Sequence, residues 1–504
     1  MTPPPIPIDG DHLTIRQVNQ AARHHFPVEW PAASRDKVIR ARALIDRCVS
    51  EDRVVYGVTT GFGKLSSVRI DTAQLAELQA NLIRSHAAGV GHPLGREETR
   101  AALLIRANVL SKGFSGVRPA VIETLVAMLN RDVLPVIPEK GSVGASGDLA
   151  PSAHVALVLM GEGEALWEGS VLPGADAMRR AGIPTLTFEA KEGLAVLNGT
   201  HVMAALGCLL LDEIDYLAGC ADMVAAMSTD AMWGTDQHFD AKIHRVRPHP
   251  GQAHSAESMR RWMSGSEIRN SHLHCDRVQD AYSMRCTPQV HGAVRDTADH
   301  ARHILEREIN SATDNPLVFA AEGEVISGGN FHGEPLAFIY DFLGIAAAEL
   351  GGISERRIER MVNPDLSGLP AFLAREPGLN SGFMIAQLTA VALLGENKIL
   401  AHPASVDSLP TSANKEDHVS MGMTAALKLR QIVENVRTVL AIELLVACQA
   451  VDFHRPARTS PALGAVHASV RGSVPFMERD RHVGADIATV AGLIRDRKLQ
   501  LGEA

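Results

Sequence analysis

The stretch VLAIELLVACQ, residues 439–449, decides the fold class. Its apolar residues surround most of the helix circumference, which is typical of a helix buried in a large bundle or between subunits. Segments of similar helical character cover most of the chain beyond residue 190, at roughly 200–228, 336–361, 382–402, 417–451 and 485–497. The sequence therefore predicts an all-α protein.

The composition supports this prediction and excludes other classes. Only 4% of the residues are aromatic, whereas strand-rich folds rely on aromatic and β-branched residues, so an all-β protein is excluded. The 49 basic and 58 acidic residues give a net charge of −9, and a nucleic-acid partner would require a basic face. The hydrophobic fraction of 46% is sufficient for a large core.

Cysteine usage and hydropathy indicate the compartment. The chain has 6 Cys and no Cys-x-x-Cys pair, which argues against a disulfide framework or a structural zinc site. The longest uncharged stretch, Gly193–Leu211, is interrupted by the polar residues 198–201 and is a poor membrane span. The N-terminus lacks the basic and apolar regions of a secretory signal. We expect a cytoplasmic protein with no membrane partner.

Polar islands separate the apolar helices. Because loops carry function more often than helices do, these islands are where chemistry is expected. They lie at 56–63, 141–148, 198–201, 310–316, 327–334 and 411–418. The island at 141–148 leads into the run Gly141–Pro151, GSVGASGDLAP, in which Asp148 is a plausible helix cap and Pro151 suits a first helical turn.

This eleven-residue run resembles the signature of the aromatic amino-acid ammonia-lyases and related aminomutases. The resemblance implies that Ala145, Ser146 and Gly147 cyclise with loss of two waters. The product is 4-methylideneimidazol-5-one, a built-in electrophile, so no external cofactor is expected. The residue types suit this chemistry: Gly147 lets its backbone nitrogen approach the Ala145 carbonyl, Ser146 supplies the leaving hydroxyl, and Gly144 permits the strained turn.

The resemblance extends over nearly the whole chain and implies further site residues. Tyr56, in a glycine-rich loop, is the expected base for the substrate's β-proton, and Arg285 is expected to bind the substrate carboxylate. Other matched positions are expected to orient the electrophile or the amine, or to contact the substrate. They are Asn198, Gln279, Tyr282, Asn315 and Phe331.

Two positions indicate the substrate. His86 stands where phenylalanine- and tyrosine-acting members have Leu, and Glu416 stands where phenylalanine-acting members have Gln. A polar imidazole partner and a carboxylate suit an imidazole ring better than a phenyl ring. The expected reaction converts L-histidine into trans-urocanate and ammonia. Lys415, His201 and Ala281 depart from the usual pattern, and Lys415 could lower the pKa of Glu416 if the two side chains touch.

Two alternatives stay open at this point. One is a phenylalanine or tyrosine lyase, or an aminomutase, of the same family. The other is a catalytically silent helical scaffold, against which the presence of Ser146, Tyr56, Tyr282 and Arg285 speaks. No His-x-x-x-His helix is evident, and we expect no essential metal.

The resemblance also implies an architecture. It is a long helical bundle with a smaller N-terminal catalytic region, of the ammonia-lyase/fumarase-like kind. We expect residues 1–200 to form the region that carries the electrophile and residues 201–504 to form the bundle. A homotetramer whose active sites combine residues of three subunits is implied as well.

Overall fold

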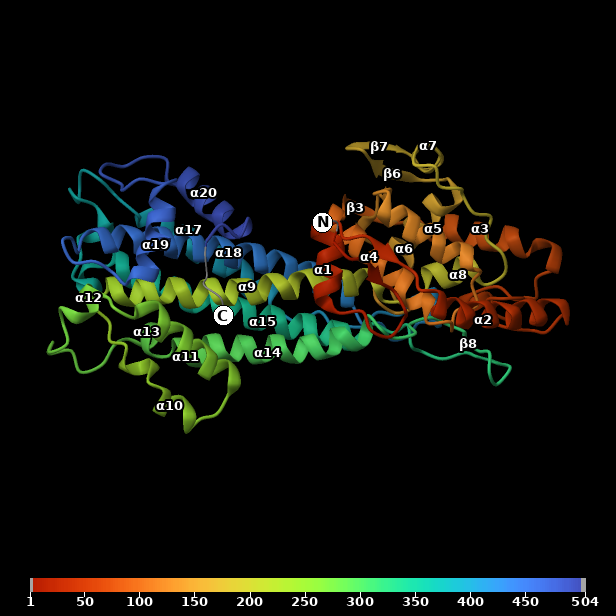
Figure 1. Ribbon diagram of the computed structural model, residues 1–504, viewed down its shortest axis with the longest axis horizontal. Coiled ribbons are helices and arrows are strands. Elements are labelled where there is room, and N and C mark those ends of the chain that lie inside the picture. Colours follow the sequence, from red (N-terminus) through yellow and green to blue (C-terminus); the bar gives the residue numbers. More distant parts are fainter. Residues whose placement is uncertain (1–2, 500–504) are drawn as a thin grey trace. The chain divides into compact units, whose positions relative to one another are not determined.

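The computed structural model describes residues 3–499 and is dominated by helices (Figure 1). Every strand in that range is only two to four residues long, so the all-α prediction is confirmed. The chain forms two compact units, each built from three segments. The first unit comprises residues up to 210, 301–341 and 403–427, and the second comprises 211–300, 342–402 and the residues from 428 onward.

The first unit combines short and medium helices with small sheets. Its helices are α1 (Ile15–His24), α2 (Ala32–Ser50), α3 (Leu75–His86), α4 (Arg96–Ser111), α5 (Pro119–Asn130), α6 (Leu149–Met160), α7 (Gly174–Arg180) and α8 (Glu192–Leu197). Its strands are β1 (Ile6–Pro7), β2 (Val28–Glu29), β3 (Val90–Pro93), β4 (Leu134–Pro135), β5 (Pro138–Lys140), β6 (Glu164–Trp167), β7 (Ser170–Pro173), β8 (Leu317–Phe319) and β9 (Glu324–Ile326). They pair as β1-β2, β3-β5, β4-β6-β7 and β8-β9, and the first of these pairs is parallel.

The described residues of the second unit form helices and loops, and none of the strands lies in it. It contains α10 (Ala241–Arg245), α11 (Pro250–Met263), α12 (Glu267–Asn270), α13 (Tyr282–Arg285), α16 (Pro364–Ser367), α17 (Met384–Leu400), α19 (Pro461–Arg471) and α20 (Val483–Arg495). Four helices contribute residues to both units: α9 (His201–Ala231), α14 (Thr287–Glu308), α15 (Glu334–Val362) and α18 (Gly422–Asp452). The two compact units are discontinuous in sequence, so they do not test a single boundary at residue 200. That boundary stays a prediction.

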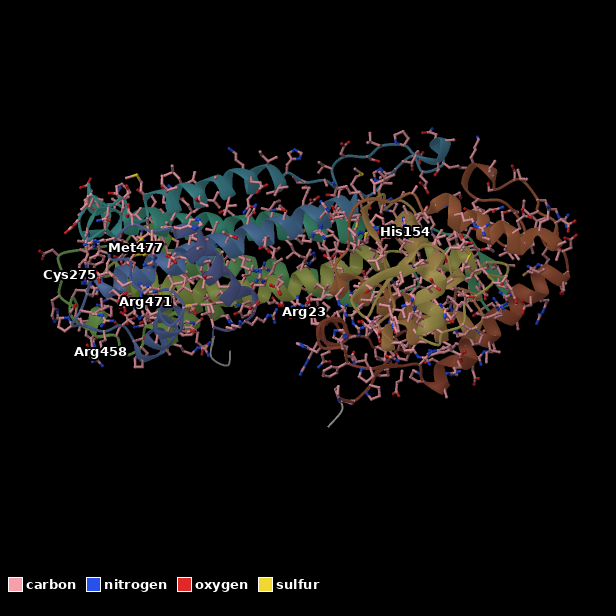
Figure 2. The ribbon with its side chains drawn as sticks, turned by 90° about the horizontal axis from the view of Figure 1, so that it is seen from above. Arg23, His154, Cys275, Arg458, Arg471 and Met477 are labelled. Carbon is pink, nitrogen blue, oxygen red and sulfur yellow. The ribbon has the colours of Figure 1, made fainter. Side chains whose placement is uncertain are left out.

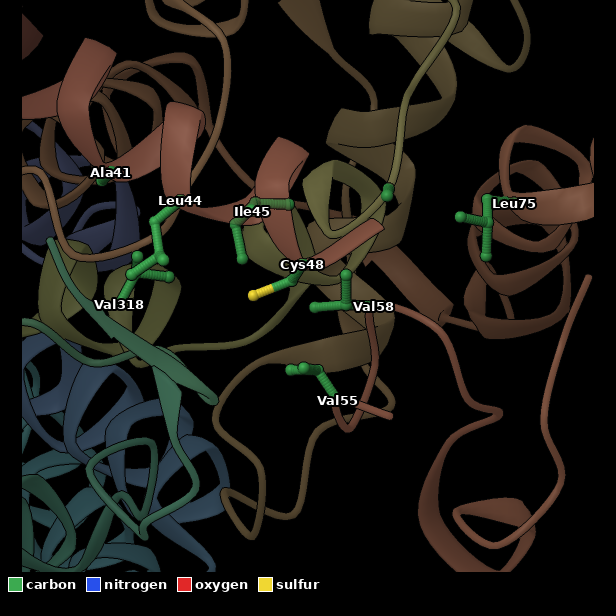
Figure 3. Close-up of a cluster of buried hydrophobic side chains, with 9 residues drawn as sticks. Ala41, Leu44, Ile45, Cys48, Val55, Val58, Leu75 and Val318 are labelled. Carbon is green, nitrogen blue, oxygen red and sulfur yellow. The ribbon is translucent and has the colours of Figure 1, made fainter. Parts of the chain in front are cut away.

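A cluster of buried apolar side chains in the first unit fixes the loop that carries Tyr56 (Figure 3). Val55 and Val58, on either side of Tyr56, both belong to it. They pack with side chains of α2, α3 and β8, namely Ala41, Leu44, Ile45, Cys48, Leu75 and Val318. Burial of a Val or Leu side chain contributes about 1.5–3 kcal/mol, so both ends of this turn are held firmly.

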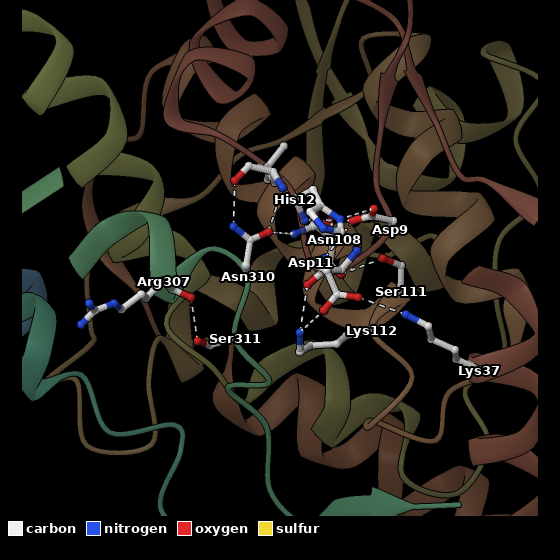
Figure 4. Close-up of polar contacts among 12 residues, drawn as sticks. Asp9, Asp11, His12, Lys37, Asn108, Ser111, Lys112, Arg307, Asn310 and Ser311 are labelled. Atoms are coloured by element: carbon white, nitrogen blue, oxygen red, sulfur yellow. Dashed lines mark hydrogen bonds and ion pairs between the residues drawn. The ribbon is translucent and has the colours of Figure 1, made fainter. Parts of the chain in front are cut away.

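Amide side chains connect distant segments of the first unit (Figure 4). Asn108 of α4 accepts from the Gly10 amide at 2.9 Å and donates to the Ile309 carbonyl at 2.9 Å. Asn310 exchanges two hydrogen bonds with the backbone of Leu13, at 2.7 and 2.8 Å. These bonds anchor the start of the polar island at 310–316.

The stretch 439–449 is buried along its whole length, as predicted. Its one charged residue, Glu443, accepts from Arg357 at 2.5 and 2.9 Å and from Ser228 at 2.7 Å. A buried carboxylate is tolerated only when it is paired and hydrogen-bonded, and these contacts place α9, α15 and α18 side by side within the second unit. Arg471, labelled in Figure 2, donates to Asp452 at the end of α18 at 2.8 Å.

Most helix boundaries agree with the sequence prediction within a few residues, but the role of Asp148 differs. Asp148 is the N-cap residue of α6, yet its side chain makes no capping bond to that helix. It accepts instead from the backbone amides of Val202 and Met203, at 3.0 and 2.9 Å. Asp148 therefore serves the N-terminus of α9, where amide groups lack intrahelical partners.

The stretch 193–211 is divided between α8 and α9 and forms no continuous helix. Among the described residues, one helix, α15, is long and apolar enough to cross a membrane by length and composition. Of its most apolar window, 61% is buried inside the structure. A buried core helix passes the same test, so α15 is weak evidence for a membrane span.

Candidate active site

A cavity of about 310 Å³ lies in the first unit, and many of the predicted site residues line it. Seven of the predicted side chains reach it: Tyr56, His86, Ser146, Asn198, Asn315, Phe331 and Glu416. The rest of the wall is formed mainly by Leu side chains, together with Phe62, Lys64 and Ser412. An apolar wall with a few convergent polar groups is the usual form of a small-molecule site.

Ser146 is held from two sides. Its hydroxyl donates to Glu416 Oε1 at 2.6 Å, and its carbonyl accepts from Asn198 Nδ2 at 2.9 Å. The second oxygen of Glu416 accepts from the Thr411 hydroxyl at 2.6 Å. The residues that precede α6, α9 and α18 are thus brought together, although 270 positions separate Ser146 from Glu416.

Gly147 occupies a place that no other residue could fill without strain. Its φ of +72° lies in the left-handed region, and a Cβ there would stand 2.1 Å from the Gly199 carbonyl oxygen. The same oxygen accepts from the Asp148 amide at 2.7 Å. Gly144 has a φ of +70°, and a Cβ there would meet Ser420 Oγ at 2.1 Å. The backbone on both sides of Ala145-Ser146 is therefore tightly turned and enclosed.

Asp148 is fully buried directly behind this turn. Besides the two amides of α9, its side chain accepts from Ser142 Oγ at 3.1 Å. Burial disfavours the charged carboxylate and raises the pKa of Asp148 to about 7, although these hydrogen bonds oppose the shift. A group that titrates near neutrality therefore lies next to the tripeptide.

His86 ends α3 at the cavity wall. Its Nδ1 lies 2.8 Å from the Leu82 carbonyl, which can only accept, so Nδ1 carries the proton and Nε2 is left as an acceptor. Burial lowers the pKa of His86, while the Leu82 carbonyl and Glu416 oppose the shift. The imidazole is therefore neutral at pH 7. Ser85, the preceding residue, is exposed and does not line the cavity.

The remaining cavity residues have defined backbone partners. The Tyr56 hydroxyl oxygen accepts from the Gly63 amide at 3.2 Å within its own loop. Asn315 Oδ1 accepts from the Gly328 amide at 2.8 Å, which connects the islands at 310–316 and 327–334. Asn198 Oδ1 is buried and has no hydrogen-bond partner, so one acceptor at the cavity is left available.

Besides Ala145 and Gly147 of the tripeptide, three predicted residues lie outside the cavity lining and form a group of their own in the second unit. Arg285 donates to Gln279 Oε1 at 2.6 Å, and its guanidinium stacks over the Tyr282 ring at 4.7 Å. Tyr282 is 70% exposed. The residues that line the cavity all belong to the first unit, and these three are not among them.

The departures from the family pattern lie outside the cavity. Lys415 is exposed and does not line it. His201 is buried, with Nε2 at 2.9 Å from Ser152 Oγ, and burial lowers its pKa well below the ordinary value. Ala281 caps α13. Among the lining residues that sequence reasoning missed, Lys64 had a signal, since it directly follows the glycine-rich island at 56–63.

Comparison with known proteins agrees with this geometry. Residues 13–472 match the model of a protein family described as aromatic amino acid lyase. The chain belongs to this family. Histidine ammonia-lyase of Koribacter versatilis is 56% identical over 98% of both chains.

Two solved structures extend the similarity. Histidine ammonia-lyase of Trypanosoma cruzi superposes with a TM-score of 0.90 at 44% identity, covering 99% of this chain and 94% of the other. Tyrosine aminomutase of Streptomyces globisporus superposes with a TM-score of 0.94 at 41% identity, covering 99% and 98%.

Proposed function

We propose that this member of the aromatic amino acid lyases eliminates ammonia from L-histidine and releases trans-urocanate. The observation that carries the proposal is the presence of His86 and Glu416 on the wall of the cavity that contains Ser146. A phenyl ring would leave both polar groups without partners, which costs about 1–3 kcal/mol for each buried group. The full-length similarity to proteins named histidine ammonia-lyase supports the same substrate.

The tripeptide fits the expected 4-methylideneimidazol-5-one. The turn at Gly144 and Gly147 is enclosed by Gly199 and Ser420, which restrains the backbone in the compact form that cyclisation needs. Asn198 would hold the group through the carbonyl of Ser146, as it holds that carbonyl in this structure. Once formed, the group supplies an electrophilic carbon to which the substrate can attach.

Tyr56 is proposed to remove the β-proton. The Gly63 amide donates to its hydroxyl oxygen at 3.2 Å and fixes the position of that oxygen in the cavity. The apolar cluster around Val55 and Val58 keeps the loop in place while the proton is removed. Proton transfer by a positioned side chain typically contributes about 10²–10⁴-fold to the rate.

Glu416 and His86 are proposed to bind the substrate ring. Glu416 Oε1 accepts from the Ser146 hydroxyl, and this hydroxyl leaves when the tripeptide cyclises. The oxygen is then free to accept from an imidazole N–H, while Thr411 keeps the other oxygen in position. His86 Nε2 offers a second acceptor, and Phe331 and Asn315 complete the wall.

We propose that neighbouring copies supply the residues that this cavity lacks. Arg285 would bind the substrate carboxylate in the two-pronged manner of guanidinium groups, positioned by Gln279 and accompanied by Tyr282. A homotetramer also accounts for the apolar side chains that α17 exposes to solvent, which are Ile385, Leu388, Val391 and Ile399. The assembly is proposed to act in the cytoplasm.

The experiment that tests the proposal compares the wild-type protein with Ser146→Ala. Incubation with L-histidine is followed by near-ultraviolet absorbance, which rises as urocanate forms. We expect the variant to be inactive, because no hydroxyl can leave, while far-ultraviolet circular dichroism stays unchanged. Activity retained in the variant would contradict the proposed electrophile.

A second candidate rests on the similarity to tyrosine aminomutase. Such a protein would convert L-tyrosine to its β-isomer rather than release ammonia. His86 and Glu416 together favour the first candidate, because an imidazole ring has two polar ring atoms, whereas a phenol ring has one hydroxyl. Chromatography of the products from L-tyrosine distinguishes the two.

A further inference from the structure

Three side chains near the cavity converge on one point without lining it. They are His332, Glu334 and His418, and their nitrogen and oxygen atoms all lie within 4.8 Å of one another. All three belong to the first unit. Phe331 and Glu416, one and two positions away from these histidines in the sequence, line the cavity, so the cluster lies close to it. Sequence spacing gave no sign of it, because His418 is far along the chain from the other two.

One oxygen of the Glu334 carboxylate lacks a hydrogen bond. Its Oε2 atom is buried and has no hydrogen-bond partner among residues 3–499. His332 Nδ1 and His418 Nε2 each lie 3.8 Å from Glu334, beyond hydrogen-bond distance. A buried carboxylate oxygen without a partner is costly, so its presence calls for an occupant between these groups.

The His332 ring is oriented as a ligand would be. Its Nε2 lies 3.3 Å from the His418 carbonyl oxygen, which can only accept. The proton therefore resides on Nε2, and Nδ1, which lies 3.8 Å from Glu334 Oε2, keeps its lone pair. Metal-bound imidazoles commonly donate their other N–H to a backbone carbonyl in this way. The two histidine rings are stacked, with their planes 6° apart, so the exposed His418 ring has to turn before its lone pair meets the same ion as that of His332.

We propose that His332 Nδ1, Glu334 Oε2 and His418 Nε2 form a binding site for a divalent transition cation such as Zn²⁺. Imidazole and carboxylate are ligands that this class of ion accepts. Bonds of about 2.0–2.2 Å place tetrahedral ligand atoms roughly 3.4 Å apart, so the observed 3.8 Å separations need only a small contraction. His418, whose side chain is 69% exposed, has room to make it.

Cation binding at this cluster would restrict the motion of the segments that enclose the cavity. The Gly333 amide and the Ser420 hydroxyl both donate to the Gly144 carbonyl at 3.0 Å, next to the tripeptide. A cation that joins His332 and Glu334 to His418 would fix these two segments against each other. This effect on turnover rests on the proposed function, but the binding of the cation does not.

The test is calorimetric titration of the chelator-treated full-length protein with Zn²⁺. We expect one tight equivalent per chain in the wild type. His332→Asn and His418→Asn should each weaken that equivalent at least about tenfold, by comparison with the 10–100-fold loss typical when a supporting contact of a metal ligand is removed. His92→Asn, an exposed histidine outside the cluster, is the matched control and should bind as the wild type does.

The proposal is overturned if the wild type shows no tight equivalent or if His418→Asn binds Zn²⁺ unchanged. Circular dichroism reports whether each variant folds. If His332→Asn does not fold, the His418→Asn variant, which changes an exposed side chain, still shows whether the cluster binds Zn²⁺. Because Zn²⁺ is titrated without substrate, an absence of histidine turnover leaves this result intact, and the two failures can be distinguished.

Discussion

His86 and His201 show how position decides the role of a residue type. Burial lowers the pKa of both, so both are neutral at pH 7. His86 lines the cavity with one ring nitrogen available as an acceptor, whereas His201 is bound to Ser152 away from it. The first is proposed to select the substrate, and the second contributes to packing behind the tripeptide.

Replacing His86 by Leu tests the proposed specificity. The variant loses a polar partner for the substrate ring, and a net hydrogen bond contributes about 0.5–1.5 kcal/mol. We expect kcat/KM for L-histidine to fall about tenfold. Asn81→Ala, on the exposed face of α3 and outside the cavity, is the control and should retain wild-type kinetics. Unchanged histidine turnover in His86→Leu would refute the role of this residue.

His201→Gln should change how stability depends on pH. The folded-state pKa of His201 lies below the unfolded value of about 6.5, so below that pH the unfolded chain binds a proton that the folded chain does not. Wild-type stability therefore falls on acidification, by up to about 1.4 kcal/mol per pH unit from this group. Urea unfolding should show the two proteins in parallel above about pH 6.5 and the wild type losing more stability below it. If the unfolding free energies of the two proteins change in parallel over the whole pH range, His201 is not responsible for the loss of stability on acidification.

At the scale of elements, α18 depends on one buried ion pair. Glu443→Gln leaves the Arg357 guanidinium buried without a counter-charge, which costs about 3–5 kcal/mol. We expect the free energy of unfolding in urea to fall by that amount. Glu349→Gln, on the exposed face of α15, is the control. A loss below about 1 kcal/mol would mean that the pair adds little to the packing of α15 and α18.

Local patterns explain what the sequence could predict. The apolar run 439–449 and the glycine-rich stretch 141–148 can each be recognised within about a dozen residues. The predictions of a buried helix and of a tight turn both agree with the structure. Long-range pairings could not be predicted from spacing. The capping of α9 by Asp148 and the bond between Ser146 and Glu416 depend on the tertiary fold. The resemblance, rather than periodicity, brought Glu416 into the expected site.

At the scale of the whole molecule, the proposed active site divides its residues between copies. The cavity contains Ser146 and Tyr56, whereas Tyr282 and Arg285 form a separate group in the second unit. An enzyme arranged in this way has no complete site in a single chain. Assembly would then be a condition of activity as well as of stability.

Complementation tests this division. Ser146→Ala and Tyr282→Phe chains are each expected to be inactive, but mixed assemblies should contain sites that are intact in both positions. Random mixing of equal amounts restores activity to about a quarter of the sites. Ser146→Ala mixed with a chain that carries both substitutions is the control. Activity no higher than that of the separate variants would place all the catalytic residues of a site in one chain.

The most direct measurement compares the wild-type protein on L-histidine, L-phenylalanine and L-tyrosine under one set of conditions. With His86 and Glu416 on the cavity wall, we predict that kcat/KM for urocanate formation exceeds the values for the other two amino acids by at least about a hundredfold. Turnover of phenylalanine or tyrosine without urocanate from histidine would contradict the account.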